Sequence, residues 1–141
     1  MFLGLGSNLG DRAGNIERAI CLIRERVGEV LRQSSLIETE PWGFESENRF
    51  LNGVVLCETS LSPHRLLRVT QQVERTMGRR KSVAPLTPDA PRRYKDRIID
   101  IDILLYDDLT VDEPDLKIPH PLMKEREFVM KPLQEIQQKE R

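Results

Sequence analysis

The 141-residue chain has few cysteines, few aromatic residues and no long apolar run. Its two cysteines, Cys21 and Cys57, lack metal-ligand spacing, which predicts packed thiols rather than a zinc site or a disulfide framework. No stretch approaches the about 20 apolar residues of a membrane span, and the N-terminus lacks the regions of a signal peptide. The net charge of −1 gives no overall attraction to nucleic acid or to an anionic membrane. We therefore expect one cytoplasmic domain over residues 1–141, with neither nucleic acid nor membrane as a partner.

Several catalytic motifs are also missing. The sequence has no G-x-S-x-G, no Cys-His pair and no obvious general base. Gly4, Gly6 and Gly10 have the wrong last spacing for a dinucleotide fingerprint, and no Lys-Ser/Thr follows them as in a Walker A loop. These glycines are explained by a tight turn, or by a backbone wall of a ligand pocket. A reaction that depends on positioning and charge more than on acid–base chemistry, such as phosphoryl-type transfer, fits best.

The hydrophobic pattern predicts alternating strands and helices. The expected order is a strand at 2–8, a helix ending at Gly28, strands at 29–39 and 50–58, a helix from Ser62 to Gly78, and a strand at 97–105. This βαββαβ order predicts an α+β, ferredoxin-like fold, an antiparallel sheet with helices packed on one face. Beyond it, four prolines at 114, 119, 121 and 132 predict only short elements.

The last predicted strand carries Asp100 and Asp102 within an aliphatic run. Residues two apart in a strand share a face, so these carboxylates would lie side by side, about 6–7 Å apart at Cα. We place Ile98 and Leu104 on the same face and Leu105 on the opposite one. Adjacent carboxylates repel and lose hydration, and a divalent metal such as Mg²⁺ would compensate them. A half-solvated strand face with two structural acids is the alternative.

A basic loop at 79–97 precedes this strand. It holds seven basic residues against two acidic ones, in a chain of nearly zero net charge. The loop could be a cationic flap that closes on a polyphosphate, a solvated loop, or an RNA-contacting loop. Its position next to the aspartate pair favours the first interpretation, because Mg²⁺ and arginine together neutralise a triphosphate.

Aromatic residues lie in predicted loops or at element ends, where they could stack on a flat ligand: Trp42, Phe50, Tyr94 and Phe128. Asn52 would share the strand face of Phe50 and could bind the edge of a heterocycle. His120 lies between two prolines, which fix the backbone and could direct its imidazole at a phosphate.

Five sequence blocks, in order, resemble the 6-hydroxymethyl-7,8-dihydropterin pyrophosphokinase family of folate biosynthesis. The signature Arg-x-x-Asp-aliphatic-Asp is present as Arg97 to Asp102. The other blocks are Leu5-Gly6-Ser7-Asn8-Leu9-Gly10-Asp11, Phe50-Leu51-Asn52-Gly53, Glu74-x-x-x-Gly78-Arg79, and Pro119-His120-Pro121 through Arg126-x-Phe128-Val129. The resemblance implies a Mg²⁺-dependent enzyme that transfers pyrophosphate from ATP to the pterin hydroxyl and releases AMP.

The resemblance also implies roles for individual residues. Asp100 and Asp102 would hold two Mg²⁺ ions. The pterin would contact Thr39, Glu40, Pro41, Trp42, Phe50, Asn52, Tyr94 and Phe128. ATP would contact Gln71, Glu74, Arg79, Arg97, His120 and Arg126. Arg79, Lys81 and Arg97 would serve the transfer itself. The family commonly has Gly-Pro where this chain has Lys95-Asp96, and Lys81 stands in place of an arginine.

Two rival functions are compatible with the residues alone. One is a ferredoxin-like binding module that contacts RNA through the 79–97 loop, which would leave the aspartate pair unexplained. The other is a metal-dependent nucleotidyl enzyme, which would release pyrophosphate instead of AMP. For the pyrophosphokinase we expect a monomer whose partners are its small-molecule substrates.

Overall fold

The computed structural model describes residues 1–39, 49–78, 98–121, 123 and 127–138. Its elements are β1 (Phe2–Ser7), α1 (Arg12–Arg26), β2 (Gly28–Gln33), β3 (Ile37–Thr39), β4 (Phe50–Thr59), α2 (Pro63–Thr76), β5 (Asp100–Leu105), β6 (Val111–Glu113), β7 (Leu116–Ile118) and α3 (Glu127–Gln138). No helix among these residues is long and apolar enough to span a membrane.

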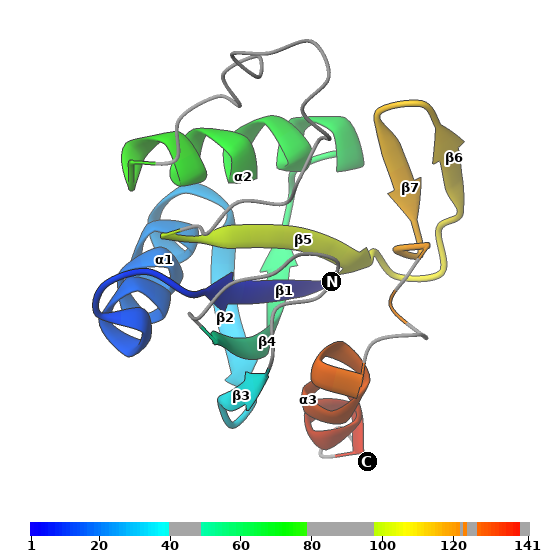
Figure 1. The fold of residues 1–141 in the computed structure, drawn as a ribbon. Helices are drawn as coiled ribbons and strands as arrows, with labels where there is room; N and C mark the ends of the chain where they lie inside the picture. The colour runs from blue at the N-terminus through cyan, green and yellow to red at the C-terminus, as the bar shows by residue number, and fades with distance from the viewer. Residues whose placement is uncertain (40–48, 79–97, 122, 124–126, 139–141) are drawn as a thin grey trace, which may run out of the picture.

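The main sheet is five-stranded and antiparallel, with the order β2-β4-β1-β5 and with β3 paired to β4 (Figure 1). Helices α1 and α2 share one apolar core with the same face of this sheet. That core joins Ile16, Ile20, Ile23, Leu66 and Val73 of the helices to Leu3, Leu5, Val55, Ile101 and Ile103 of the strands. The predicted α+β ferredoxin-like arrangement is confirmed.

The end of α1 and both ends of α2 lie where the sequence predicts. Asp11 caps α1 by accepting from the Gly14 N–H, and Ser62 caps α2 by accepting from the Arg65 N–H. Gly78 follows α2 with φ +102, a conformation that favours glycine. Gly28 follows α1 where a Cβ atom would collide with the carbonyl oxygen of Glu58. These local signals fix where the two helices begin and end.

The tail contains more structure than predicted. Strands β6 and β7 form a separate two-stranded sheet, and α3 runs for 12 residues with Pro132 inside it. An interior proline costs a helix about 3 kcal/mol. Here the apolar residues of α3 offset that cost, because Val129, Leu133 and Ile136 are buried against Leu104 and the residues of β4. The expectation of only short elements was therefore wrong.

Irregularities in the strands account for further differences. The predicted strand at 29–39 is two strands, β2 and β3, separated at residues 34–36. A register shift near Phe2 in the β1–β5 pair turns Leu105 toward the core of α3, not toward α1 and α2. Ile98 precedes β5 and packs on the core of α1 and α2, so it does not share a face with the aspartates. The alternation of residues along the strand could show neither the register shift at Leu105 nor the position of Ile98 outside β5.

The two cysteines differ in accessibility. Cys21 is exposed on α1, whereas Cys57 is buried in β4, and burial raises the pKa of the Cys57 thiol to about 11. Because the thiolate is the reactive form, a disulfide reagent at pH 8 should label one thiol in the folded protein and two after denaturation. A Cys21→Ser variant should show no rapid labelling. Rapid native labelling of that variant would contradict the burial of Cys57.

Candidate active site

Strand pairing brings chemically different residues onto one face of the sheet. Gly6 of β1 lies opposite Asp100 on one side and Asn52 on the other. Gly4 lies opposite Asp102 and Val54 in the next row. Directly opposed residues in antiparallel strands share a face, so both aspartates and Asn52 lie on one face, called the aspartate face from here on. This confirms the pairing of the two acids on one face of their strand.

Helix α3 covers only part of the aspartate face. Its apolar residues pack on Leu104, near the end of β5, and on Leu56 of β4. Asp100 and Asp102 lie nearer the start of β5 and are half-buried. The aspartates therefore lie beyond the apolar part of the face that α3 packs on.

Strand β1, which lies between the aspartates of β5 and Asn52 of β4, has no side chain on this face at Gly4 and Gly6. A Cβ atom at Gly6 would lie 3.0 Å from Asn52 Oδ1 and 3.5 Å from Phe50 Cδ1, which shows that both side chains lean over β1. A Cβ atom at Gly4 would lie 3.4 Å from the Leu104 side chain. The glycines at 4 and 6 thus belong to strand β1 and not to the turn, where Gly10 has φ +64. Gly4 and Gly6 form a stretch of bare backbone on the aspartate face, called the β1 floor from here on. Of the two explanations given above, this agrees with a backbone wall and not with a tight turn.

Asn52 is held in a defined orientation. It is buried at 7% exposure, and its Nδ2 donates a 2.8 Å hydrogen bond to Thr39 Oγ1. Thr39 in turn lies opposite Phe50 in the β3–β4 pair. A buried amide beside an aromatic ring is suited to binding the polar edge and the face of a flat heterocycle. The predicted residues Thr39, Phe50 and Asn52 are therefore brought together.

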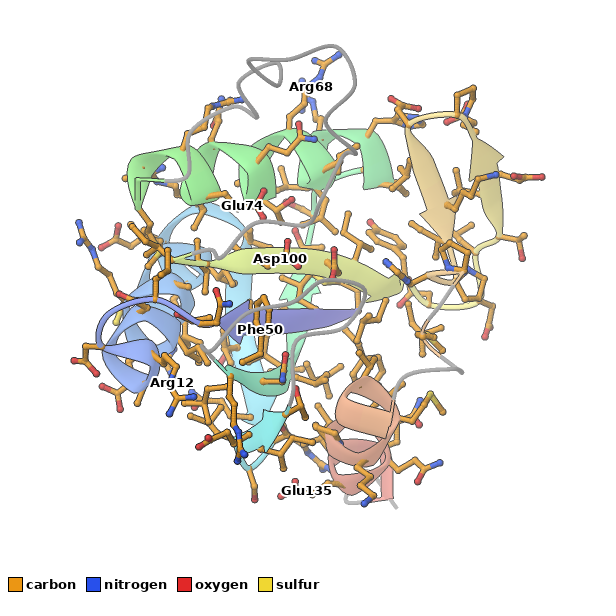
Figure 2. The ribbon with its side chains drawn as sticks, in the orientation of Figure 1. Arg12, Phe50, Arg68, Glu74, Asp100 and Glu135 are labelled. Carbon is orange, nitrogen blue, oxygen red and sulfur yellow. The ribbon has the colours of Figure 1, made fainter. Side chains whose placement is uncertain are left out.

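Glu74 and His120 lie along the outer edge of β5. Glu74 of α2 is buried, and its Oε2 accepts a 3.0 Å hydrogen bond from the backbone N–H of Ile101, between the two aspartates (Figure 2). The backbone N–H of His120 donates to the Leu104 carbonyl oxygen at 3.1 Å. Both residues expected at the nucleotide thus flank the strand that carries the acids, while Gln71 is exposed on α2.

Other predicted site residues lie outside the described part of the chain. They are Glu40, Pro41, Trp42, Arg79, Lys81, Tyr94, Arg97 and Arg126. The expected closure of the 79–97 loop falls on the same residues. Phe128 lies on α3, but its side chain is outside the described part.

Within the described residues, one group of three possible metal ligands gathers elsewhere. It consists of the exposed His64, Glu113 and Asp115, and His64 Nε2 pairs with a carboxylate oxygen of Glu113. Such exposed groups are common without a metal. The aspartates of β5 differ because they are half-buried on a face that also carries an aromatic ring and a buried amide.

The arrangement has a counterpart among known proteins. The sequence model of the 7,8-dihydro-6-hydroxymethylpterin-pyrophosphokinase (HPPK) family matches residues 2–138. The chain belongs to the HPPK family. The match spans β1 through α3, so it includes the aspartates of β5, Asn52 and the helix that covers part of the aspartate face.

Individual HPPK relatives agree over nearly the whole chain. The 2-amino-4-hydroxy-6-hydroxymethyldihydropteridine pyrophosphokinase of Porphyromonas gingivalis is 45% identical over 96% of this chain and 89% of its own length. The enzyme of the same name from Bacillus subtilis is 40% identical over 96% of this chain and 76% of its own. The mitochondrial folate synthesis bifunctional protein of Pisum sativum is 39% identical over 95% of this chain but only 24% of its own. The HPPK unit therefore also occurs within longer proteins.

Two features of the HPPK site depend on tertiary structure and were missed, wholly or in part, by the sequence patterns. A backbone wall of a ligand pocket was one of the two explanations for Gly4 and Gly6, but which residues lie opposite them was not predicted, because that depends on strand register. The hydrogen bond from Ile101 to Glu74 was also missed. The spacing of Glu74 with the buried Leu66 and Val73 on α2 places it close to the core, which is the one signal that could have suggested it.

Proposed function

We propose that this protein transfers the pyrophosphoryl group of ATP to the hydroxyl of 6-hydroxymethyl-7,8-dihydropterin, giving AMP and the pterin diphosphate ester in folate biosynthesis. The carrying observation is the row Asn52–Gly6–Asp100 across three strands. It juxtaposes groups suited to a flat heterocycle with groups suited to a metal-bound phosphate. A pyrophosphokinase needs these two half-sites close together, because only a hydroxymethyl group separates the pterin ring from the oxygen that attacks ATP.

The metal half of the site is assigned to Asp100 and Asp102. Both are hard carboxylate donors on one face, and each lies opposite a glycine of β1 that brings no side chain of its own beside the carboxylate. This donor set fits Mg²⁺, which prefers carboxylates together with water and phosphate oxygens. Two bound Mg²⁺ ions would supply charge neutralisation of the triphosphate and a template for the incoming hydroxyl.

The pterin half of the site is assigned to β3, β4 and the segments next to them. Phe50 would stack on the ring, with Phe128 on its other side. Asn52, fixed by Thr39, would bind the edge of the ring, and this is supported by its burial and its 2.8 Å hydrogen bond. The remaining contacts are assigned to Glu40, Pro41, Trp42 and Tyr94.

The nucleotide contacts of the phosphate half-site are assigned to the edge of β5 and the basic loop. Glu74 and His120 are supported by their positions beside Ile101 and Leu104. Gln71 and Arg126 complete the nucleotide contacts. Arg79, Lys81 and Arg97 would donate to phosphate oxygens and stabilise the charge that develops during transfer.

The reaction requires mainly positioning by these residues. A bond forms between the hydroxyl oxygen of the pterin and the β-phosphorus, while the bond from that phosphorus to the α,β-bridging oxygen breaks and AMP leaves. The hydroxyl proton is released to water. The stacked ring and the Asn52 amide hold the hydroxymethyl arm in line with this bond. Holding both substrates on one rigid sheet converts an encounter of two molecules into a reaction within one complex.

The deciding experiment incubates the protein with ATP, Mg²⁺ and hydroxymethyl-dihydropterin and separates the products. AMP together with the pterin diphosphate, absent when the pterin is omitted, is the expected result. Release of pyrophosphate would indicate nucleotidyl transfer instead. Salt-dependent RNA binding that survives Asp100→Ala with Asp102→Ala, without AMP formation, would indicate a binding module.

We also infer that residues 1–141 act as one domain and as a monomer in the cytoplasm. The apolar side chains of both cores are buried within the single chain, which supports the absence of an obligate partner. Light scattering after size-exclusion chromatography tests the monomer, and a dimer mass at micromolar concentration would refute it.

A further inference from the structure

Arg12 links three elements at the edge of the candidate pterin site. It is the first residue of α1, and its Nη1 donates a 2.8 Å hydrogen bond to the carbonyl oxygen of Arg49. Its Nη2 lies 3.4 Å from Glu38 Oε2. Glu38 belongs to β3 and Arg49 directly precedes β4. One guanidinium therefore contacts β3 and the residue that leads into β4, and Arg12 lies below Phe50 in the view of Figure 2.

The helix turn that carries Arg12 is itself fixed from the N-terminal side. Asp11 caps the helix by accepting from the Gly14 N–H, so α1 begins at a defined residue. Asn15 donates to the Leu9 carbonyl oxygen at 2.8 Å and to Ser7 Oγ at 3.2 Å. These bonds join the start of α1 to the end of β1, the strand that forms the floor of the site. Arg12 and Asn15 together thus connect β1, through the start of α1, to the β3–β4 pair.

The charges favour a positional role over a large contribution to stability. Glu38 lies between two cations, because Arg49 Nη1 is 3.9 Å from Glu38 Oε1. Arg12 is the least exposed of the three side chains, at 31% against 46% for Glu38 and 58% for Arg49. Ion pairs that are open to solvent stabilise a fold little. A planar guanidinium with two directed donors can nevertheless fix the relative position of two strands, which a lysine cannot reproduce.

The residues that Arg12 holds are the immediate neighbours of the pterin contacts. Glu38 precedes Thr39, which accepts the hydrogen bond from Asn52, and Arg49 precedes Phe50. We propose that Arg12 is a positioning residue for the pterin: it fixes Thr39, Phe50 and Asn52 against the β1 floor without touching the substrate. This inference rests on the proposed function, which assigns those three residues to the pterin.

The test is a steady-state comparison of Arg12→Ala, Arg12→Lys and Glu38→Gln with wild type, with Arg18→Ala on the exposed face of α1 as the matched control. Arg12→Ala should raise KM for hydroxymethyl-dihydropterin about tenfold, while KM for ATP changes less than about twofold. Arg12→Lys should restore only part of the loss. Glu38→Gln should also raise KM for the pterin. The double variant with Arg12→Ala should raise this KM by less than the product of the two single fold-changes.

Two results would overturn the inference. One is an unchanged KM for the pterin in both Arg12→Ala and Glu38→Gln. The other is an equal rise in KM for both substrates, which would indicate general damage to the fold. If Arg12→Ala fails to fold, Glu38→Gln carries the same comparison. If wild type forms no AMP, the proposed function fails, and equilibrium titration of wild type and the variants with the pterin alone still decides whether Arg12 positions its site.

Discussion

Replacing Asp102 with alanine is expected to lower kcat for AMP formation by about 10³-fold, with the fold intact. Asp102 is half-buried on the aspartate face opposite Gly4, where it is assigned to hold Mg²⁺. Asp102→Asn keeps the shape of the side chain and removes its charge, so it should lose nearly as much activity. The free energy of unfolding should change by less than about 1 kcal/mol, because removing one of two adjacent carboxylates relieves repulsion.

The measurement is the rate of AMP formation over a series of Mg²⁺ concentrations, with urea unfolding of each variant. Asp108→Ala is the matched control, since Asp108 is an exposed aspartate in the turn that follows the same strand. It should behave as wild type. Full activity of Asp102→Asn at saturating Mg²⁺ would show that the carboxylate has no part in holding the metal.

Replacing Glu74 with alanine should destabilise the fold by about 2–4 kcal/mol and also reduce activity. Glu74 is buried at 6% exposure and accepts the N–H of Ile101, at the edge of the sheet and between the two aspartates. Its removal leaves a buried donor without its acceptor and a cavity between α2 and β5. Strand β5 would then be held less firmly where the aspartates lie, so kcat should fall beyond the loss of folded protein.

Glu74→Gln separates the structural from the electrostatic contribution. The amide oxygen can still accept from Ile101, so stability should fall by only about 1 kcal/mol. Gln72→Ala, an exposed change on the same helix, is the control for helix propensity. Urea unfolding gives the stabilities, and a Glu74→Ala variant as stable as wild type would contradict the contribution of this hydrogen bond.

Local sequence rules predicted the parts of the fold that depend on near neighbours. Ser62 marks a helix start because its side chain caps an N–H group three residues on. Asp100 and Asp102 share a face because strand geometry repeats every two residues. The same rules failed at Pro132, where burial of distant side chains outweighs a local penalty, and at Leu105, where a register shift reverses the alternation.

The sequence by itself therefore determined both ends of α2 and the end of α1, the antiparallel α+β class, the paired carboxylates and, through five blocks in order, the resemblance to the pyrophosphokinase family. The tertiary structure alone decided that Asn52 lies across Gly6 from Asp100, that Glu74 holds Ile101, and that Arg12 joins Glu38 to the backbone of Arg49. Each of these contacts links residues more than 20 positions apart. Such contacts depend on strand register and on helix packing, which no short stretch of sequence specifies.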